Sequence, residues 1–297
     1  MNHYLFGRLL APLAFALAIC GNALPIHAAL LIVDPNATYT IDFDNSVTGV
    51  NNGTYTGAGF TPTPGEGQLN SGAWAVTGFE ALVGGDLAFG GTKIDEAYAR
   101  GASAGGIALL GLYGFDVSNG GTLNRAFGIQ PSGSNWDPGT VTLRLQNTSG
   151  LEITEFDLSY RIYVRNDQGR ANSFNFSHSA DDTTYTPEAA LDFVSPQGAS
   201  SAPVSWVLTP KTITLTGLSI PNNGYYYLRW SGSNVSGSGA RDEFALDDIV
   251  LSNIETASAP IPEPTTIVLA GLAVVLFLFP RRLTATANRG IISSMGG

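Results

Sequence analysis

Hydrophobic and polar side chains alternate one by one along seven segments of this 297-residue chain. Successive side chains of a β-strand point to opposite faces of a sheet, so this alternation is typical of a strand with one buried face. Each segment is bounded by Gly, Pro, Asn or Asp, which favour turns. The pattern therefore predicts an all-β protein. The segments span residues 38–45, 140–147, 156–166, 173–179, 212–218, 225–230 and 244–253.

No segment between residues 29 and 256 keeps the 3.6-residue hydrophobic period of an amphipathic helix. The nearest approaches, residues 80–91 and 94–106, are both broken by glycine pairs. We therefore expect residues 29–256 to form one domain, a two-sheet antiparallel sandwich of the jelly-roll type. The glycine-rich stretch 49–134 is less regular, and it fits either long loops over one sheet or additional short strands.

Charge and cysteine content exclude several kinds of function. Residues 29–260 hold ten basic and 23 acidic side chains, a net charge of −13, and such a surface repels nucleic acid. The one cysteine, Cys20, lies in an apolar leader. The body of the protein therefore has no thiol for a disulfide, a zinc thiolate site or a cysteine nucleophile.

The first 28 residues have the composition of a secretory signal peptide. Arg8 is followed by an apolar run over residues 9–19 and then by a softer segment with small residues up to Ala28. We expect export of the chain and cleavage between Ala23 and Ala29. Lipidation at Cys20 is the alternative, but Ile19 stands where a small residue normally precedes a lipidated cysteine.

The last 41 residues combine a linker, an apolar segment and a tail. Residues 257–264 are rich in proline, which continues neither a strand nor a helix easily. Residues 265–282 then contain an almost uninterrupted apolar run, and we expect a short transmembrane helix here. Its 13 apolar residues, 267–279, rise only about 20 Å as a helix, so the helix spans a bilayer of about 30 Å only with local thinning. Residues 283–297 form a polar tail.

The motif Pro262-Glu263-Pro264, the apolar segment and the pair Arg281-Arg282 together resemble a PEP-CTERM sorting signal. The basic pair also fits the positive-inside rule, which leaves the body of the chain outside the cell. The resemblance covers residues 260–282. The polar tail departs from the family, whose chains usually end soon after the basic cluster.

The resemblance to the PEP-CTERM family implies a Gram-negative or related bacterium. It also implies transient retention in the inner membrane and processing near the motif by an exosortase, a membrane protease-transpeptidase. The product would then lie at the cell surface or in the extracellular matrix, and the family links such products to exopolysaccharide and biofilm.

Residues 41–44 and 245–249 resemble the first and last strands of concanavalin-like and MAM-like jelly rolls, in which the two strands meet in one sheet. Residues 177–186 similarly resemble a hairpin common in secreted bacterial sandwiches. A structural calcium near the terminal strands is frequent in such folds, and calcium takes six to eight oxygen ligands. The alternative is that Asp247 or Asp248 simply caps a turn. The candidate ligands, should the two strands pair, are Asp42, Asp44, Asp242, Glu243, Asp247 and Asp248.

The aromatic side chains lead to a carbohydrate-binding hypothesis, because the apolar faces of sugars stack on flat rings. Aromatic residues on alternating strands are nevertheless first of all core residues. Trp230 is expected to be packed, whereas Trp136, in a polar loop, is the best candidate for an exposed ring. The full set comprises Trp74, Trp136, Trp206, Trp230 and Tyr225 to Tyr227.

The sequence gives only weak evidence for a catalytic site. His178 is the only histidine of the body, with Ser177 and Ser179 beside it, but it shares a strand face with Phe174 and Phe176 and is expected to be structural. Glycosidases use paired carboxylates, and the motif that places them on one strand face is not matched by residues 152–157, where Glu152 and Glu155 face opposite sides.

The leading hypothesis is therefore a non-enzymatic, exported and exosortase-processed surface protein with a structural or adhesive role. The alternative is a carbohydrate-binding module for extracellular polysaccharide, and a glycan-cleaving enzyme is third.

Overall fold

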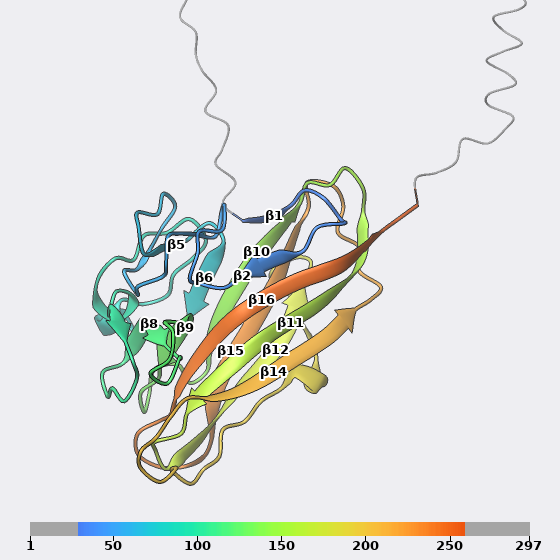
Figure 1. Cartoon of the computed structure of the whole chain (residues 1–297). Helices are drawn as coiled ribbons and strands as arrows, with labels where there is room; N and C mark the ends of the chain where they lie inside the picture. Colours follow the sequence, from blue (N-terminus) through green and yellow to red (C-terminus); the bar gives the residue numbers. More distant parts are fainter. Residues whose placement is uncertain (1–28, 259–297) are drawn as a thin grey trace, which may run out of the picture. The chain divides into compact units, whose positions relative to one another are not determined.

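The computed structural model describes residues 29–258, and in this range the chain forms β-strands and three short 3-10 turns but no α-helix. Two large sheets pack face to face (Figure 1). This arrangement confirms the predicted all-β sandwich of the jelly-roll type.

The first large sheet, sheet A, has the strand order β1-β10-β15-β12-β13, and β6 also pairs with β10. Neighbouring strands are antiparallel except β1 and β10, which are parallel. The strands are β1 (Leu30–Ile32), β6 (Trp74–Thr77), β10 (Gly139–Asn147), β12 (Arg170–Ser179), β13 (Thr186–Pro187) and β15 (Tyr225–Gly237).

The second large sheet, sheet B, has the strand order β14-β11-β16-β9-β8-β7, and β2 also pairs with β16. Its long strands are antiparallel, and only the short pair of β7 and β8 is parallel. The strands are β2 (Tyr39–Ile41), β7 (Ala102–Ser103), β8 (Gly111–Asp116), β9 (Arg125–Gln130), β11 (Ile153–Arg165), β14 (Val207–Leu215) and β16 (Glu243–Thr256).

The glycine-rich stretch 49–134 forms short strands rather than long loops alone. A small sheet with the order β3-β5-β4 lies within it. In the same stretch, β6 belongs to sheet A, and β7, β8 and β9 belong to sheet B. The helical content of residues 80–91 and 94–106 is limited to one 3-10 turn each, η1 and η2, because glycines interrupt both segments, and the second segment also contains β7. The small sheet contains β3 (Asn51–Asn52), β4 (Phe60–Thr61) and β5 (Gln68–Asn70), and the 3-10 turns are η1 (Ala81–Val83), η2 (Glu96–Tyr98) and η3 (Ala189–Leu191).

Aromatic contacts fill the space between the two large sheets. Tyr160 of sheet B meets Trp230 of sheet A edge to face, with ring centres 5.4 Å apart. Phe244 of sheet B stacks on Phe174 of sheet A at 5.7 Å. Burial of each such side chain contributes about 1.5–3 kcal/mol, so these contacts are a main source of the stability of the sandwich.

The seven predicted segments all contain strands, with shifted ends. Residues 38–45 form only β2, because the Asp42 side chain accepts hydrogen bonds from the backbone N–H groups of Asp44 (3.2 Å) and Asn45 (3.0 Å) and closes a turn. The predicted pairing of residues 41–44 with 245–249 is confirmed in part: Ile41 of β2 pairs with Ile249 of β16, but residues 42–44 lie outside β2, and the first strand, β1, belongs to sheet A.

Residues 29–258 contain no helix of the length and apolar character that a bilayer crossing requires. The predicted signal peptide, the transmembrane segment 265–282 and the residues of the sorting motif, Pro262, Glu263, Pro264, Arg281 and Arg282, lie outside the described residues.

Candidate functional site

The outer face of sheet A carries half-buried tyrosines on β15. Tyr226 points into the core and is buried, whereas Tyr225 and Tyr227 on either side point outward and are half-buried. The strand register pairs Tyr227 with Arg144 of β10, so a guanidinium group joins the rings on the same face.

Phe89, from the loop after β6, completes this group of rings. The guanidinium carbon of Arg144 lies 4.6 Å from the ring centre of Phe89 and 4.6 Å from that of Tyr225. Phe89 also packs against Tyr227, with ring centres 5.8 Å apart. Cation–π contacts of this length stabilise the arrangement. Three rings therefore surround one cation on the outside of the sheet.

Arg229 and Tyr185 extend the group toward the β12–β13 hairpin. The guanidinium carbon of Arg229 lies 3.5 Å from the ring centre of Tyr185. Arg229 also forms an ion pair with Asp182 at 3.1 Å and donates a hydrogen bond from Nε to Thr142 at 3.0 Å, while the Tyr185 hydroxyl donates to Asp182. These contacts hold both side chains in one orientation. We call the following six residues the aromatic face: Phe89, Arg144, Tyr185, Tyr225, Tyr227 and Arg229.

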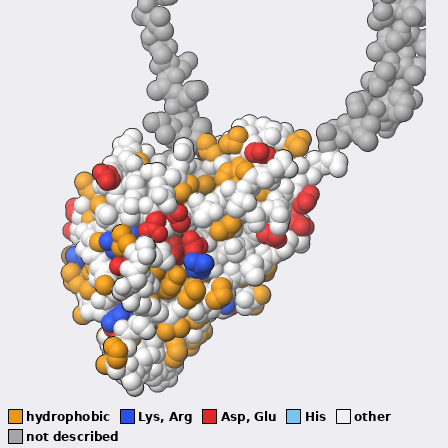
Figure 2. Space-filling view, viewed as in Figure 1, with side chains coloured by type: hydrophobic (Ala, Val, Ile, Leu, Met, Phe, Trp, Pro, Cys, Tyr) orange, Lys and Arg blue, Asp and Glu red, His pale blue; other side chains and the backbone are white. Residues whose placement is uncertain are grey.

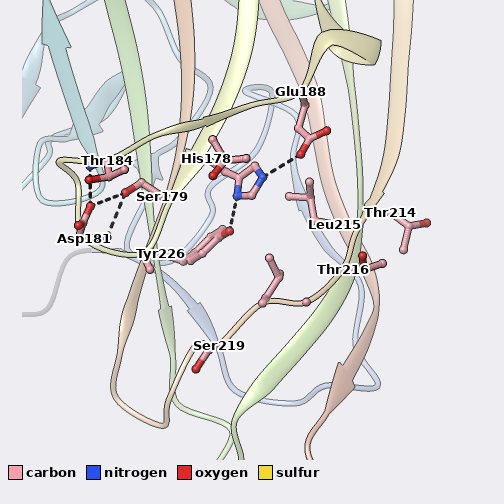
Figure 3. A pocket seen from close by; sticks show the side chains of 14 residues that line it. His178, Ser179, Asp181, Thr184, Glu188, Thr214, Leu215, Thr216, Ser219 and Tyr226 are labelled. Atoms are coloured by element: carbon pink, nitrogen blue, oxygen red, sulfur yellow. Dashed lines mark hydrogen bonds and ion pairs between the residues drawn. The ribbon is translucent and has the colours of Figure 1, made fainter.

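A polar pocket opens at the edge of the sandwich, between the β12–β13 hairpin of sheet A and the end of β14 in sheet B (Figure 3). Its volume is about 610 Å³, within the range of small-molecule sites. Hydroxyl and carboxyl groups dominate its lining. We call it the edge pocket, and the side chains used below are His178, Asp181, Glu188, Thr214, Thr216, Ser219 and Tyr226.

A chain of three hydrogen-bonded side chains forms one wall of the edge pocket. His178 lies between Tyr226 and Glu188, with Nδ1 bonded to the Tyr226 hydroxyl and Nε2 3.1 Å from Glu188 Oε1 (Figure 3). Tyr226 and His178 are 3% and 9% exposed, whereas the Glu188 side chain is 27% exposed. Burial raises the pKa of Tyr226, and the nearby Glu188 charge adds to this. The phenol is therefore neutral.

Trp136 is buried rather than exposed, so the sequence prediction of an accessible ring at this position is wrong. Its exposure is 1%. The ring packs against Gly139 of β10 and Gly232 of β15, where an added Cβ would lie 2.3 and 2.4 Å from indole atoms. Its backbone carbonyl accepts a hydrogen bond from Arg241 at 2.8 Å. The absence of side chains at the two glycines provides the space that the indole fills.

The other three tryptophans are also buried, Trp74 and Trp230 completely and Trp206 to 4% exposure. Packing of Trp230 confirms the prediction made for it. Of the aromatic residues singled out in the sequence, only Tyr225 and Tyr227 are available at a surface, because they alone occupy outward positions of a regular strand.

The candidate calcium ligands fall into two separate groups. The first group lies where β2 pairs with β16, and its members influence one another electrostatically. Acidic side chains gather over these strands in Figure 2. Burial first, then the charges of Asp248 and Asp44, raises the pKa of Asp247 to about 8. The first group comprises Asp42, Asp44, Asp247 and Asp248.

Asp242 and Glu243, at the start of β16, have other partners. Asp242 accepts hydrogen bonds from the Gln168 backbone at 3.0 Å and from the Ser195 hydroxyl at 2.9 Å. Glu243 accepts from the backbone of Gly106 at 2.9 Å and of Ile107 at 2.6 Å. Desolvation raises their pKa values to about 6 and about 7. These two acids therefore anchor loops and do not join the first group.

Asp247 is completely buried, and its Oδ1 accepts a hydrogen bond from the Asp248 backbone at 2.8 Å. Its Oδ2 has no hydrogen-bond partner among the described residues. No group of three or more His, Cys, Asp or Glu side chains within residues 29–258 is arranged to hold a metal ion.

Several site residues were not predicted from the sequence. Arg144 and Arg229 share the outward parity of Tyr225 and Tyr227, so the alternation on β10 and β15 was a usable signal for them. Phe89 and Glu188 lie in connecting segments, where no periodicity indicates which way a side chain points.

Comparisons with known proteins find only distant structural likeness. No protein-family model matches the chain, and no curated protein matches it. The chain is similar to the K1 cleaved adhesin domain of Lys-gingipain from Porphyromonas gingivalis W83, with 10% identity, a TM-score of 0.37, and coverage of 75% of this chain and 99% of that one. It is also similar to the module TmCBM61 in complex with beta-1,4-galactotriose, with 10% identity, a TM-score of 0.30, and coverage of 60% and 86%.

A third solved structure is the enzymatically active domain of tailspike protein 4 from bacteriophage CBA120. It has 9% identity, a TM-score of 0.33, and coverage of 63% of this chain, which spans 20% of that chain.

Proposed function

We propose that this chain is an exported surface protein that binds extracellular polysaccharide through the aromatic face. The observation that carries the proposal is the group of Phe89, Tyr225 and Tyr227 around Arg144 on the outside of sheet A. Sugar rings have apolar faces that stack on aromatic side chains, and neighbouring polar groups bind their hydroxyls.

The aromatic face is organised before any ligand arrives. Arg229 is held by Tyr185, Asp182 and Thr142. Arg144 contacts the rings of Phe89 and Tyr225, and Tyr227 packs against Phe89. Because these side chains are already ordered, binding costs less conformational entropy. Burial raises the pKa of Tyr227, so its phenol is neutral and serves as both hydrogen-bond donor and acceptor.

The proposed role is binding rather than cleavage. The one histidine of the body is hydrogen-bonded on both ring nitrogens, and the Tyr226 hydroxyl beside it is buried. A general acid or base has to reach the reacting atom within hydrogen-bond distance. We expect incubation with polysaccharide to release no new reducing ends.

Export and processing belong to the same proposal and are supported by the sequence. The signal peptide over residues 1–28 takes the chain out of the cytoplasm, and the motif at Pro262–Pro264 with its basic pair presents it to an exosortase in the inner membrane. The processed body then resides at the cell surface or in the matrix, where it contacts exopolysaccharide of a biofilm.

The test is affinity for bacterial and plant polysaccharides, measured by affinity electrophoresis and calorimetry. Tyr227→Ala removes one ring and is expected to weaken binding of the best ligand about tenfold. Tyr227→Phe keeps the ring and is expected to retain most of the affinity.

The matched control is Leu208→Ala, which removes an exposed apolar side chain from β14 on the other sheet. Equal affinity of Tyr227→Ala and the wild-type protein, or no binding to any polysaccharide, would overturn the proposal.

A further inference from the structure

We propose that the edge pocket is a second ligand site, specific for a sugar that carries a protonated amino group. The juxtaposition that carries the proposal is a fixed carboxylate, Glu188, at the wall of a polar cavity whose lining contains no Lys or Arg. The inference depends on the protein being a glycan-binding protein, but not on the aromatic face.

The hydrogen bonds in the wall of the pocket fix the orientation of Glu188. An ionised carboxylate only accepts hydrogen bonds, so His178 Nε2 is the donor to Glu188 Oε1. Nδ1 of the same ring is bonded to the Tyr226 hydroxyl, so the ring is fixed from both sides. The imidazole therefore orients Glu188, and the glutamate is an acceptor.

This chain leaves one glutamate oxygen for a ligand. His178 occupies Oε1, and Oε2 accepts no hydrogen bond from any described residue. The Glu188 side chain is 27% exposed, whereas the imidazole that orients it is buried. The carboxylate is therefore held in place by His178 on one side and accessible from the cavity on the other. An ammonium group is a suitable partner, because a charge-assisted hydrogen bond is stronger than a neutral one.

Further carboxylates surround the same cavity. Asp181 lines it, and hydrogen bonds from the Thr184 and Thr183 backbones lower the pKa of Asp181. Thr214, which also lines it, donates to Asp157 at 2.5 Å, and this bond lowers the pKa of Asp157.

Ser219, at the lower end of the cavity in Figure 3, donates to Glu152. The wall and the residues behind it therefore carry negative charge at neutral pH. This potential attracts a cation and repels a uronate or a phosphate.

The size and the hydroxyl lining favour a sugar over a bare ion. A cavity of about 610 Å³ is much larger than an ion requires, and the exposed hydroxyls of Thr184, Thr216 and Ser219 suit the hydroxyls of a pyranose. The ligand class is therefore an amino sugar with a free amine, as a residue of a polysaccharide or as an oligosaccharide.

The test compares two probes by calorimetry on the intact body of the protein, a β-1,4-linked glucosamine oligosaccharide and its fully N-acetylated counterpart. The free amine is expected to bind about tenfold more tightly. Glu188→Gln removes the charge while keeping the shape, and it is expected to abolish the preference. Glu66→Gln, which removes an exposed charge from the loop before β5, is the matched control and is expected to leave the preference unchanged.

A second variant tests the proposal independently, should Glu188→Gln fail to fold. Thr216 is exposed at the end of β14, so Thr216→Arg places a cation at the pocket without disturbing the core, and it is expected to abolish binding of the amine. Equal affinity for the two probes, no binding of either, or an unchanged preference in both variants would each overturn the pocket proposal. Tyr227→Ala is expected to leave amine binding intact, so failure of the pocket and failure of the aromatic face give different results.

Discussion

Asp247 is an ionisable side chain in surroundings that disfavour its charged form. It is fully buried, one of its oxygens has no hydrogen-bond partner among the described residues, and other carboxylates lie nearby. Removing an ionised carboxylate from water costs several kcal/mol unless it is paired. The protein therefore holds this group in its neutral form over part of the physiological pH range.

The first prediction concerns the pH dependence of stability. The pKa of Asp247 is raised from 3.8 to about 8 in the folded protein, so the folded state binds more protons than the unfolded state between these values. The free energy of unfolding is expected to fall as pH rises through this window, by up to about 1.4 kcal/mol per pH unit.

Asp247→Asn removes the group, and urea unfolding at about pH 5 and about pH 8 is expected to show a smaller loss than in the wild-type protein. Asp95→Asn, at an exposed carboxyl, is the control. The same loss in Asp247→Asn and in the wild-type protein contradicts the raised pKa.

Calcium remains a prediction from the sequence, now restricted to the group around Asp44 and Asp247. A cation there stabilises the ionised carboxylates, so millimolar calcium is expected to raise the melting temperature at about pH 8. Asp247→Asn is expected to remove that increase. A melting temperature that calcium does not change in the wild-type protein rejects the site.

At the scale of elements, alternation predicts the long strands well, because one face of each is buried. Residues 140–147 and 225–230 lie in β10 and β15 as expected, and the side of the sheet on which Tyr226 and Trp230 lie follows from the same pattern. Alternation does not predict whether a loop side chain is buried. The prediction that Trp136 is exposed is therefore wrong, because its burial depends on two glycines from different strands that meet only in the folded sheet.

The contact of Trp136 with β15 gives the next prediction. A Cβ at position 232 would lie 2.4 Å from the indole nitrogen, so Gly232→Ala forces the ring or the strand to move. We expect a destabilisation of about 1–3 kcal/mol by urea unfolding, as for other overpacked cores. Gly169→Ala, where nothing lies within 4 Å of the added carbon, is the control. If Gly232→Ala lowers the free energy of unfolding no more than Gly169→Ala does, the space around the Trp136 indole accommodates the added carbon and the prediction is wrong.

At the scale of the whole molecule, the alternating pattern within residues 29–258 predicts the sandwich that the structure shows. For residues 1–28 and 265–282, composition and the resemblance to a sorting signal predict a signal peptide and a transmembrane helix.

The last prediction follows from exosortase processing. Intact mass and C-terminal peptide analysis of the protein recovered from the surface or medium of its host are expected to show a C-terminus close to Pro262 to Thr265. A chain that still reaches Gly297 shows that the apolar segment is a permanent anchor, and the processing proposal then fails.

The position of β16 determines how this sandwich bears a mechanical load. β16 spans 14 residues, about 45 Å of extended chain, and has β11 on one side and β9 and β2 on the other. A pull directed along the axis of β16 would load the hydrogen bonds to its neighbours together in shear rather than break them one at a time from an end. Tension applied at the end of β16 enters sheet B, and with polysaccharide bound to the aromatic face it would reach sheet A through the core between the two sheets.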